Sequence, residues 1–153
     1  SGSGSITHLA SELFLDMAKI KIVHVPYKGT GPALNDVIAG NVQLLFGSVA
    51  TTLQHIKSGR LRGLAVTTSK RIFAVPELST VAEAGVPGYD VILWHGLVGP
   101  KGIPKAIVDR LNSEAGQILK SKAMEDLLAA DGVTPAGGTP EQFQRSMSDL
   151  INA

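Results

Sequence analysis

Three chain reversals that precede helices combine glycine with hydroxyl residues, and this combination suits an anion-binding site. Residues 25–33 (VPYKGTGPA) leave an apolar run and enter a helix at Pro32, and residues 44–48 (LLFGS) repeat the pattern. Residues 1–7 open the first helix in a similar way. A helix start presents unpaired backbone N–H groups and the positive end of the helix dipole, and glycine allows close approach to the backbone. Several such turns at one end of a sheet predict a carboxylate or phosphate site.

Each turn also has a simpler interpretation, because Gly, Pro and Ser before a helix usually form only a turn and a cap. The Ser-Gly repeat at residues 1–5 is also typical of a linker or a cloning remnant. The repeat lacks the lysine that a P-loop requires, which argues against a nucleotide phosphate loop. We expect Ser5 or Ser3 to cap the first helix, which would make these residues part of the fold.

Other residues that carry chemistry do not form a recognisable catalytic or metal-binding pattern. No two of the four histidines are four residues apart, which is the usual spacing of helical metal ligands. Ser48 follows a glycine at a strand-to-helix turn but lacks the flanking glycines of a nucleophile elbow. Arg71 suits either a bidentate clamp on a ligand carboxylate or a tie within its own lobe. We therefore expect no catalytic residue, no metal and no cofactor.

Composition limits the classes of protein to which the chain can belong. Its 153 residues are 44% hydrophobic and 18% charged, with a net charge of +1, which indicates a folded domain with an ample core. The sequence has no basic stripe with interleaved aromatic residues, so nucleic acid is not an expected partner. It has no cysteine, which excludes disulfides, thiolate zinc sites and cysteine nucleophiles.

Apolar spacing predicts an alternation of helices and strands. Helices are expected at residues 6–18 and 32–39, between Ser48 and Gly59, and over residues 80–85 after a capping box. Strands are expected at residues 20–25, 42–46 and 61–67, followed by a long extended segment at residues 89–98. This alternation favours an α/β fold with a doubly wound parallel sheet.

The C-terminal part of the chain has a different character. Helices are expected from Pro104, over residues 123–130 up to Gly132, and over residues 139–152 after a second capping box. The last helix carries an apolar stripe of Phe143, Met147, Leu150 and Ile151.

Four segments together resemble a known family. The most specific is HVPYKGTGPAL at residues 24–34, and the others are LRGLAVT at 61–67, TVAEAG at 80–85 and WHGL at 94–97. They resemble the solute-binding proteins of tripartite tricarboxylate transporters, the Bug family. The segments occur in the family's order, and the resemblance extends over essentially the whole chain.

The resemblance implies a periplasmic receptor of two α/β lobes, of the type II periplasmic-binding-protein fold, with a cleft between the lobes. Such a receptor binds a small carboxylated solute, a dicarboxylate or similar organic acid, and delivers it to a membrane permease. Residues 1–92 would form one ligand-binding lobe. Residues 93–153 would form a crossover segment and trailing helices that pack on an N-terminal lobe preceding this chain. Ser79 departs from the family, which commonly has proline there.

The family's ligand contacts come largely from turns at helix starts. By motif they correspond to Ser3, Gly4, Ser5, Tyr27, Thr30, Gly31, Pro32, Ala33, Gly47 and Ser48. These positions coincide with the three turns that the residues themselves single out.

Two hypotheses of function remain at this point. The first is a non-enzymatic binding protein, and the alternative is an α/β enzyme that acts on a carboxylated or phosphorylated metabolite through the same turns. An enzyme needs an acid–base pair or a metal, and the sequence offers neither, so we expect the chain not to be an enzyme. Without a second lobe, the isolated chain is expected to bind carboxylates weakly and to self-associate.

Overall fold

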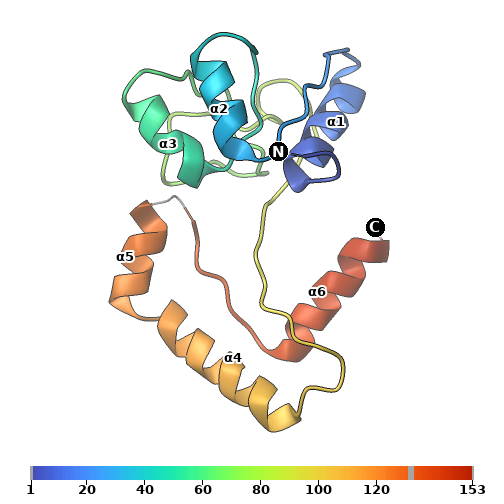
Figure 1. Ribbon diagram of the computed structural model, residues 1–153, viewed down its shortest axis with the longest axis vertical. Coiled ribbons are helices and arrows are strands. Elements are labelled where there is room, and N and C mark those ends of the chain that lie inside the picture. Colours follow the sequence, from blue (N-terminus) through green and yellow to red (C-terminus); the bar gives the residue numbers. More distant parts are fainter. Residues whose placement is uncertain (1, 131–132, 153) are drawn as a thin grey trace. The chain divides into compact units, whose positions relative to one another are not determined.

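The computed structural model describes residues 2–130 and 133–152, which belong to two compact units (Figure 1). The first unit is Ser1–Leu93 and the second is Trp94–Ala153. Each unit has its own helices and its own packing. None of the described helices has the length and apolar character needed to cross a membrane.

The first unit contains three helices whose ends follow local sequence signals. Helix α1 (Ile6–Ala18) has the predicted bounds, and the Ser5 side chain caps it by accepting a hydrogen bond from the His8 N–H at 3.3 Å. Helix α2 (Thr30–Ile38) begins two residues earlier than expected, after Gly29 at φ 129°. Helix α3 (Val49–Lys57) follows Ser48 and ends before Gly59 at φ 72°.

The core of the first unit lies around α3 and the irregular segment that follows it. Leu53, Val66 and Val75 are buried together, with four partly buried apolar neighbours: Val49, Ile72, Ala74 and Leu78. A second buried contact joins α1 to the end of the unit. The fully buried Tyr89 donates its hydroxyl hydrogen to the Ala10 carbonyl at 2.9 Å, and its ring meets the Phe14 ring edge-on at a centroid distance of 6.2 Å.

The predicted doubly wound sheet is not confirmed. Within residues 2–130 and 133–152, β pairing is limited to one isolated parallel bridge between Val66 and Thr80. In that bridge the Val66 N–H donates to Ser79 O and the Val81 N–H donates to Val66 O, both at 2.9 Å. The segment at residues 20–25 shows that an apolar run does not by itself form a paired strand. The Ile22 and Val23 side chains are 48% and 86% exposed, so no layer of the described residues covers this segment as a parallel sheet would require.

The short helix expected at residues 80–85 is also absent. The capping box itself is present, because the Thr80 N–H donates to Glu83 Oε2 and the Glu83 N–H donates to Thr80 Oγ1, both at 3.0 Å. The chain then forms successive turns instead of an α-helix. Gly85 at φ 122° and Pro87 both interrupt helical geometry, so the box has too few residues after it to nucleate a helix.

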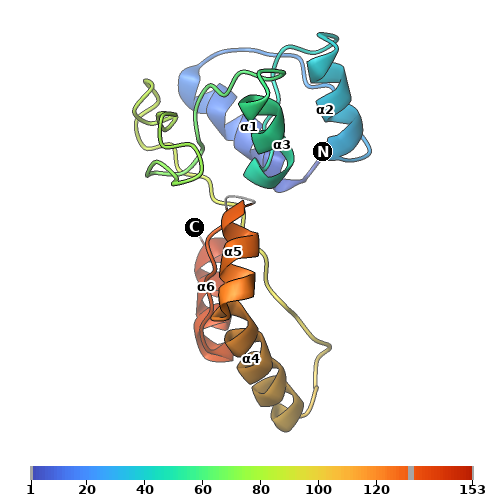
Figure 2. The ribbon, with the colours of Figure 1, turned by 90° about the vertical axis from the view of Figure 1, so that its left-hand side faces the viewer.

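The second unit consists of α4 (Lys105–Leu119), α5 (Lys122–Ala130) and α6 (Pro140–Asn152). Helices α4 and α5 follow each other directly along the chain (Figure 2). A capping box opens α6, with the Thr139 N–H donating to Gln142 Oε1 at 2.8 Å. The structure does not describe Gly132, where α5 was predicted to end. It also does not describe the side chains of Leu150 and Ile151.

Part of the apolar stripe on α6 is already packed within the second unit. The Phe143 ring meets the Trp94 ring edge-on at a centroid distance of 5.6 Å. It also lies directly against the backbone of Gly96, where an added Cβ would come within 2.7 Å of Phe143 Cε2. The glycine at position 96 therefore allows the segment after Trp94 to contact α6.

Candidate functional site

The first candidate turn is folded and belongs to the start of α1. Gly4 has φ 79°, and its N–H donates to His8 Nδ1 at 3.1 Å. The Ser5 N–H donates to Gly2 O at 3.2 Å, while the Ser5 side chain caps the helix. Ser3 is exposed beside them. The expectation that Ser5 caps this helix is confirmed, and residues 2–5 of the Ser-Gly repeat are part of the fold.

The second candidate turn forms the start of α2. Gly29 occupies the N-cap position at φ 129°, where a residue with a Cβ would be strained. Thr30, Gly31, Pro32 and Ala33 then form the first turn of the helix. A Cβ added at Gly31 would meet open space, so the backbone there is accessible. Ala33 is only 2% exposed and faces the interior.

The first and second turns lie next to each other. A Cβ built on Gly2 would be 3.8 Å from the Tyr27 carbonyl oxygen, so the two backbones run close together. The His8 and His24 rings stack with centroids 4.4 Å apart and planes inclined by 24°. Both views show the beginning of the chain beside the N-terminal end of α2 (Figures 1 and 2). The structure thus brings together the two segments that lead into α1 and α2.

Tyr27 is tied to the helix that follows it. Its hydroxyl donates to Asp36 Oδ2 at 2.6 Å, and Asn41 Nδ2 donates to Asp36 Oδ1 at 3.1 Å. The hydrogen bond to Asp36 raises the pKa of the Tyr27 hydroxyl. The hydrogen bonds from Tyr27 and Asn41 lower the pKa of Asp36, which is therefore ionised at neutral pH.

The third candidate turn, at Gly47 and Ser48, precedes α3. Ser48 occupies the N-cap position, but its side chain makes no capping hydrogen bond; its hydroxyl lies 3.0 Å from Thr51 Oγ1 instead. A Cβ at Gly47 would lie only 2.8 Å from Thr52 Cγ2, so any side chain here would force Thr52 to shift. The Phe46 ring packs on Phe14 of α1 at a centroid distance of 5.8 Å.

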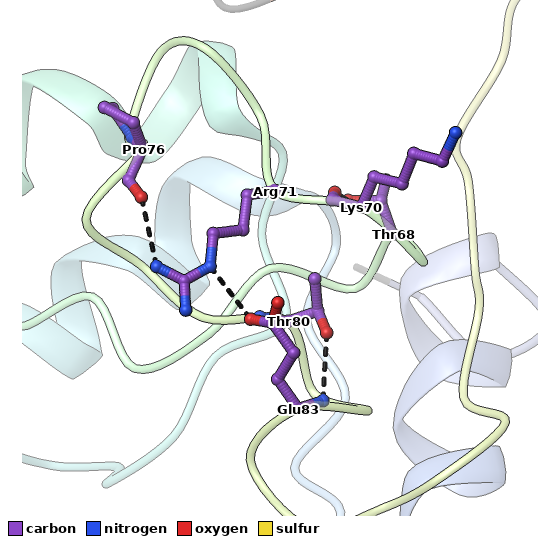
Figure 3. Close-up of polar contacts among 6 residues, drawn as sticks. All are labelled: Thr68, Lys70, Arg71, Pro76, Thr80 and Glu83. Atoms are coloured by element: carbon purple, nitrogen blue, oxygen red, sulfur yellow. Dashed lines mark hydrogen bonds and ion pairs between the residues drawn. The ribbon is translucent and has the colours of Figure 1, made fainter.

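Arg71 ties loops together within the first unit (Figure 3). Its Nε donates to Glu83 Oε2 at 2.9 Å, and its Nη1 donates to Pro76 O at 3.4 Å. The N–H of Thr80 and the guanidinium of Arg71 lower the pKa of Glu83. Of the two roles that the sequence left open for Arg71, the tie within its own lobe is the one that the structure shows.

The described residues contain no group of three or more His, Cys, Asp or Glu side chains that could hold a metal ion. His8 packs on His24, and its Nε2 lies 3.6 Å from Glu12 Oε1. Sequence reasoning gave no role to Asp36, whose partner Tyr27 lies nine residues earlier and off the helix. The two residues meet only because the turn before α2 folds against the helix. Their separation in the sequence follows no helical spacing, so the sequence does not reveal the contact.

Comparison with known proteins places the chain in a receptor family. The family model described as "Tripartite tricarboxylate transporter family receptor" matches residues 1–153. A relative from Pseudomonas sp. strain P51, "UPF0065 protein in tcbD-tcbE intergenic region", is 40% identical over 142 residues. The match covers 92% of this chain and 42% of the relative. The chain therefore spans less than half the length of this relative.

Solved structures give the same result. The R. palustris protein Rpa4515 with adipate has a TM-score of 0.91 at 39% identity, covering 97% of this chain and 50% of that chain. The periplasmic binding protein BugD has a TM-score of 0.90 at 32% identity, and the match covers 99% of this chain and 52% of BugD. MatC (Rpa3494) from Rhodopseudomonas palustris with bound malate has a TM-score of 0.82 at 30% identity, and the match covers 93% of this chain and 48% of MatC. The chain belongs to the tripartite tricarboxylate transporter receptor family.

Proposed function

We propose that this chain supplies part of the binding site for a small carboxylated solute, a dicarboxylate or similar acid, which the receptor delivers in the periplasm to a membrane permease. Support comes from the family, which is one of receptors, and from two similar proteins whose structures hold adipate and malate. In this proposal residues 1–92 form one lobe of a type II periplasmic-binding-protein fold and contact the solute. Residues 93–153 connect that lobe to the rest of the receptor.

The observation that carries the proposal is that the segments leading into α1 and α2 lie side by side. A Cβ built on Gly2 would be 3.8 Å from the Tyr27 carbonyl oxygen, and these residues lie four and three positions before their helices. The N-terminal end of a helix carries a partial positive charge, and some of its N–H groups have no partner within the helix, so two neighbouring helix entries favour a bound carboxylate. Such a site needs no lysine or arginine.

The proposed residues would contribute in different ways. Gly31 is exposed, and the position of an added Cβ is open, so a solute could approach this residue closely and its N–H would donate to a carboxylate oxygen. Pro32 has no N–H and contributes only a fixed φ, while the buried Ala33 can offer only its backbone. Ser3, Gly4 and Ser5 would contribute from the start of α1, and Gly47 and Ser48 from the turn before α3. Thr30 would donate its hydroxyl.

Titration of the 153-residue chain with adipate or malate, followed by NMR chemical shifts, tests this proposal. We expect saturable shifts at residues 2–5 and 28–33, and none with the uncharged diamide of adipic acid. Thr30→Ala should weaken binding by about tenfold, since a hydrogen bond to a charged group contributes about 1.5–3 kcal/mol. Gly31→Val should weaken it at least several-fold, because the side chain occupies the open face.

Two substitutions in the second unit serve as matched controls. Thr134→Ala removes an exposed threonine hydroxyl, and Gly116→Val adds a side chain at a helical glycine where an added Cβ also meets open space. Neither should change the dissociation constant. Unchanged affinity in both Thr30→Ala and Gly31→Val would show that the turn is only structural, and absence of any acid-dependent shift would overturn the proposed function.

A further inference from the structure

The Asp36 carboxylate connects the segments on both sides of α2. One carboxylate oxygen accepts the Tyr27 hydroxyl at 2.6 Å, and the other accepts the Asn41 side-chain amide at 3.1 Å. The backbone carbonyl of Asp36 also accepts the Asn41 N–H at 2.9 Å and the Val42 N–H at 3.4 Å. Asp36 thus contacts the turn that enters the helix and the turn that leaves it.

The turn that enters α2 has no side-chain cap at its N-cap position. Its N-cap is Gly29, which has no side chain to cap the helix and which samples many backbone conformations when unrestrained. The hydrogen bond from Tyr27 to Asp36 provides a fixed point two residues before Gly29. A tether at that place limits the conformations of residues 27–31.

We propose that Asp36 is a positioning residue for the carboxylate site: by accepting the Tyr27 hydroxyl, it holds the turn of residues 27–31 in the conformation that presents its backbone N–H groups to the solute. This inference rests on the proposed function of the chain. A site held in its binding conformation before the ligand arrives loses less entropy on binding.

The tether also defines what Tyr27 can do for a ligand. Its hydroxyl hydrogen is directed to Asp36 and is not available to a solute carboxylate, which can only accept hydrogen bonds. Tyr27 therefore acts on an anionic solute through its backbone and through the conformation of the turn. The hydrogen bond lowers the pKa of Asp36 and raises the pKa of Tyr27, so at neutral pH the carboxylate is ionised and the hydroxyl keeps its proton, as the tether requires.

A double-mutant cycle tests the positioning role. NMR titration with malate would compare the 153-residue chain with Tyr27→Phe, Asp36→Ala and the double variant. Each single change should weaken binding by about tenfold. The double variant should bind no more weakly than Asp36→Ala alone, since that change already removes the hydrogen bond from Tyr27, together with the one from Asn41. Asp16→Ala is the control, because it removes an exposed helical aspartate that pairs with Lys19. It should leave the affinity unchanged.

Two measurements report the tether without a ligand. In Asp36→Ala the ultraviolet titration of Tyr27 should move down toward the ordinary range of a tyrosine, with Tyr27→Phe assigning the transition against Tyr89. Amide hydrogen exchange at residues 28–31 should become faster in both single variants, while exchange in α3 stays the same. Unchanged exchange at residues 28–31 would overturn the tether.

The outcomes distinguish the positioning role of Asp36 from the proposed solute-binding function of the chain. If the unmodified chain binds malate and both single variants bind equally well, Asp36 has no positioning role and the proposed function stands. Fully multiplicative losses of affinity would also overturn the positioning role, because the two residues would then act independently. If the unmodified chain binds no carboxylate although the tether is detected by exchange, the proposed function fails and the site role of Asp36 fails with it.

Discussion

At the residue scale, Gly47 is required by packing rather than by its backbone angle. An added Cβ would lie 2.8 Å from Thr52 Cγ2, and Thr52 cannot rotate freely because its hydroxyl donates to Ser48 O at 2.9 Å. We expect Gly47→Ala to lower the free energy of unfolding by about 1–3 kcal/mol, the usual cost of overpacking. Denaturant unfolding of the chain measures this directly.

Removing the contacted methyl group gives an internal check on that explanation. Thr52→Ser keeps the hydroxyl and deletes Cγ2, so Gly47→Ala combined with Thr52→Ser should recover most of the lost stability. Gly116→Ala is the matched control, because its Cβ meets open space in α4. It should be neutral or stabilising by about 0.5–1 kcal/mol. Equal losses for the alanines at positions 47 and 116 would contradict the packing argument.

Residue roles could be predicted from the sequence where both partners are close along the chain. Ser5 as a helix cap and the Thr80–Glu83 and Thr139–Gln142 capping boxes are confirmed, because each depends on a spacing of three residues. The Arg71 ion pair with Glu83 and the Tyr27 contact with Asp36 span twelve and nine residues. Such pairs depend on how turns fold back, which a local pattern does not specify.

At the element scale, the loop closed by Thr80, Glu83 and Arg71 should depend on pH. The pKa of Glu83 is lowered, first by the Thr80 N–H and then by Arg71. A lowered pKa means that the ionised carboxylate stabilises the folded loop at neutral pH. This stabilisation is present above the ordinary glutamate range and is lost as the pH falls through the lowered value. We expect the Glu83 titration midpoint, followed by NMR, to lie below that of an unfolded peptide.

Arg71→Gln should raise that midpoint only part of the way, because the Thr80 N–H remains as the larger cause. Arg62→Gln, which changes an exposed arginine of the same unit, is the control and should leave the midpoint in place. A full return to the value of an unfolded peptide in Arg71→Gln would mean that Arg71, and not the Thr80 N–H, dominates.

Helices were more predictable than strands for a physical reason. A helix closes its hydrogen bonds within one segment, so apolar spacing and caps predicted the segments that become α1, α3 and α6. A strand needs a partner elsewhere in the chain and layers on its faces. The apolar run at residues 20–25 therefore indicated a strand but could not specify pairing. The capping box at residue 80 indicated a helix start but not whether the helix would continue.

At the scale of the whole molecule, the family could be predicted because several motifs occur in order along the chain, and the comparisons confirm it. The division into units falls at Leu93 and Trp94. The ten residues assigned to the ligand stay a prediction, which the neighbouring positions of the first two turns support. A site made of backbone N–H groups leaves no diagnostic side-chain pattern, so sequence alone indicates its turns and not its ligand.

The isolated chain should associate with itself as its concentration rises. Helix α4 exposes an apolar stripe at Ile107, Leu111 and Ile118, which are 48%, 45% and 52% exposed, and Leu97 and Val98 are 73% and 77% exposed. Exposed apolar surface of this kind favours protein–protein contact. We expect sedimentation velocity to show a weight-average mass that rises above 16.0 kDa with concentration.

Substitutions on α4 decide whether this stripe is responsible. Ile107→Glu combined with Leu111→Glu should reduce the association, because a charge on each turn makes burial of the stripe costly. The matched control is Ile22→Glu in the first unit, where the apolar side chain is also 48% exposed but lies outside the stripe. It should leave the association unchanged. A constant mass of 16.0 kDa at every concentration would show that the exposed stripe does not bring copies of the chain together.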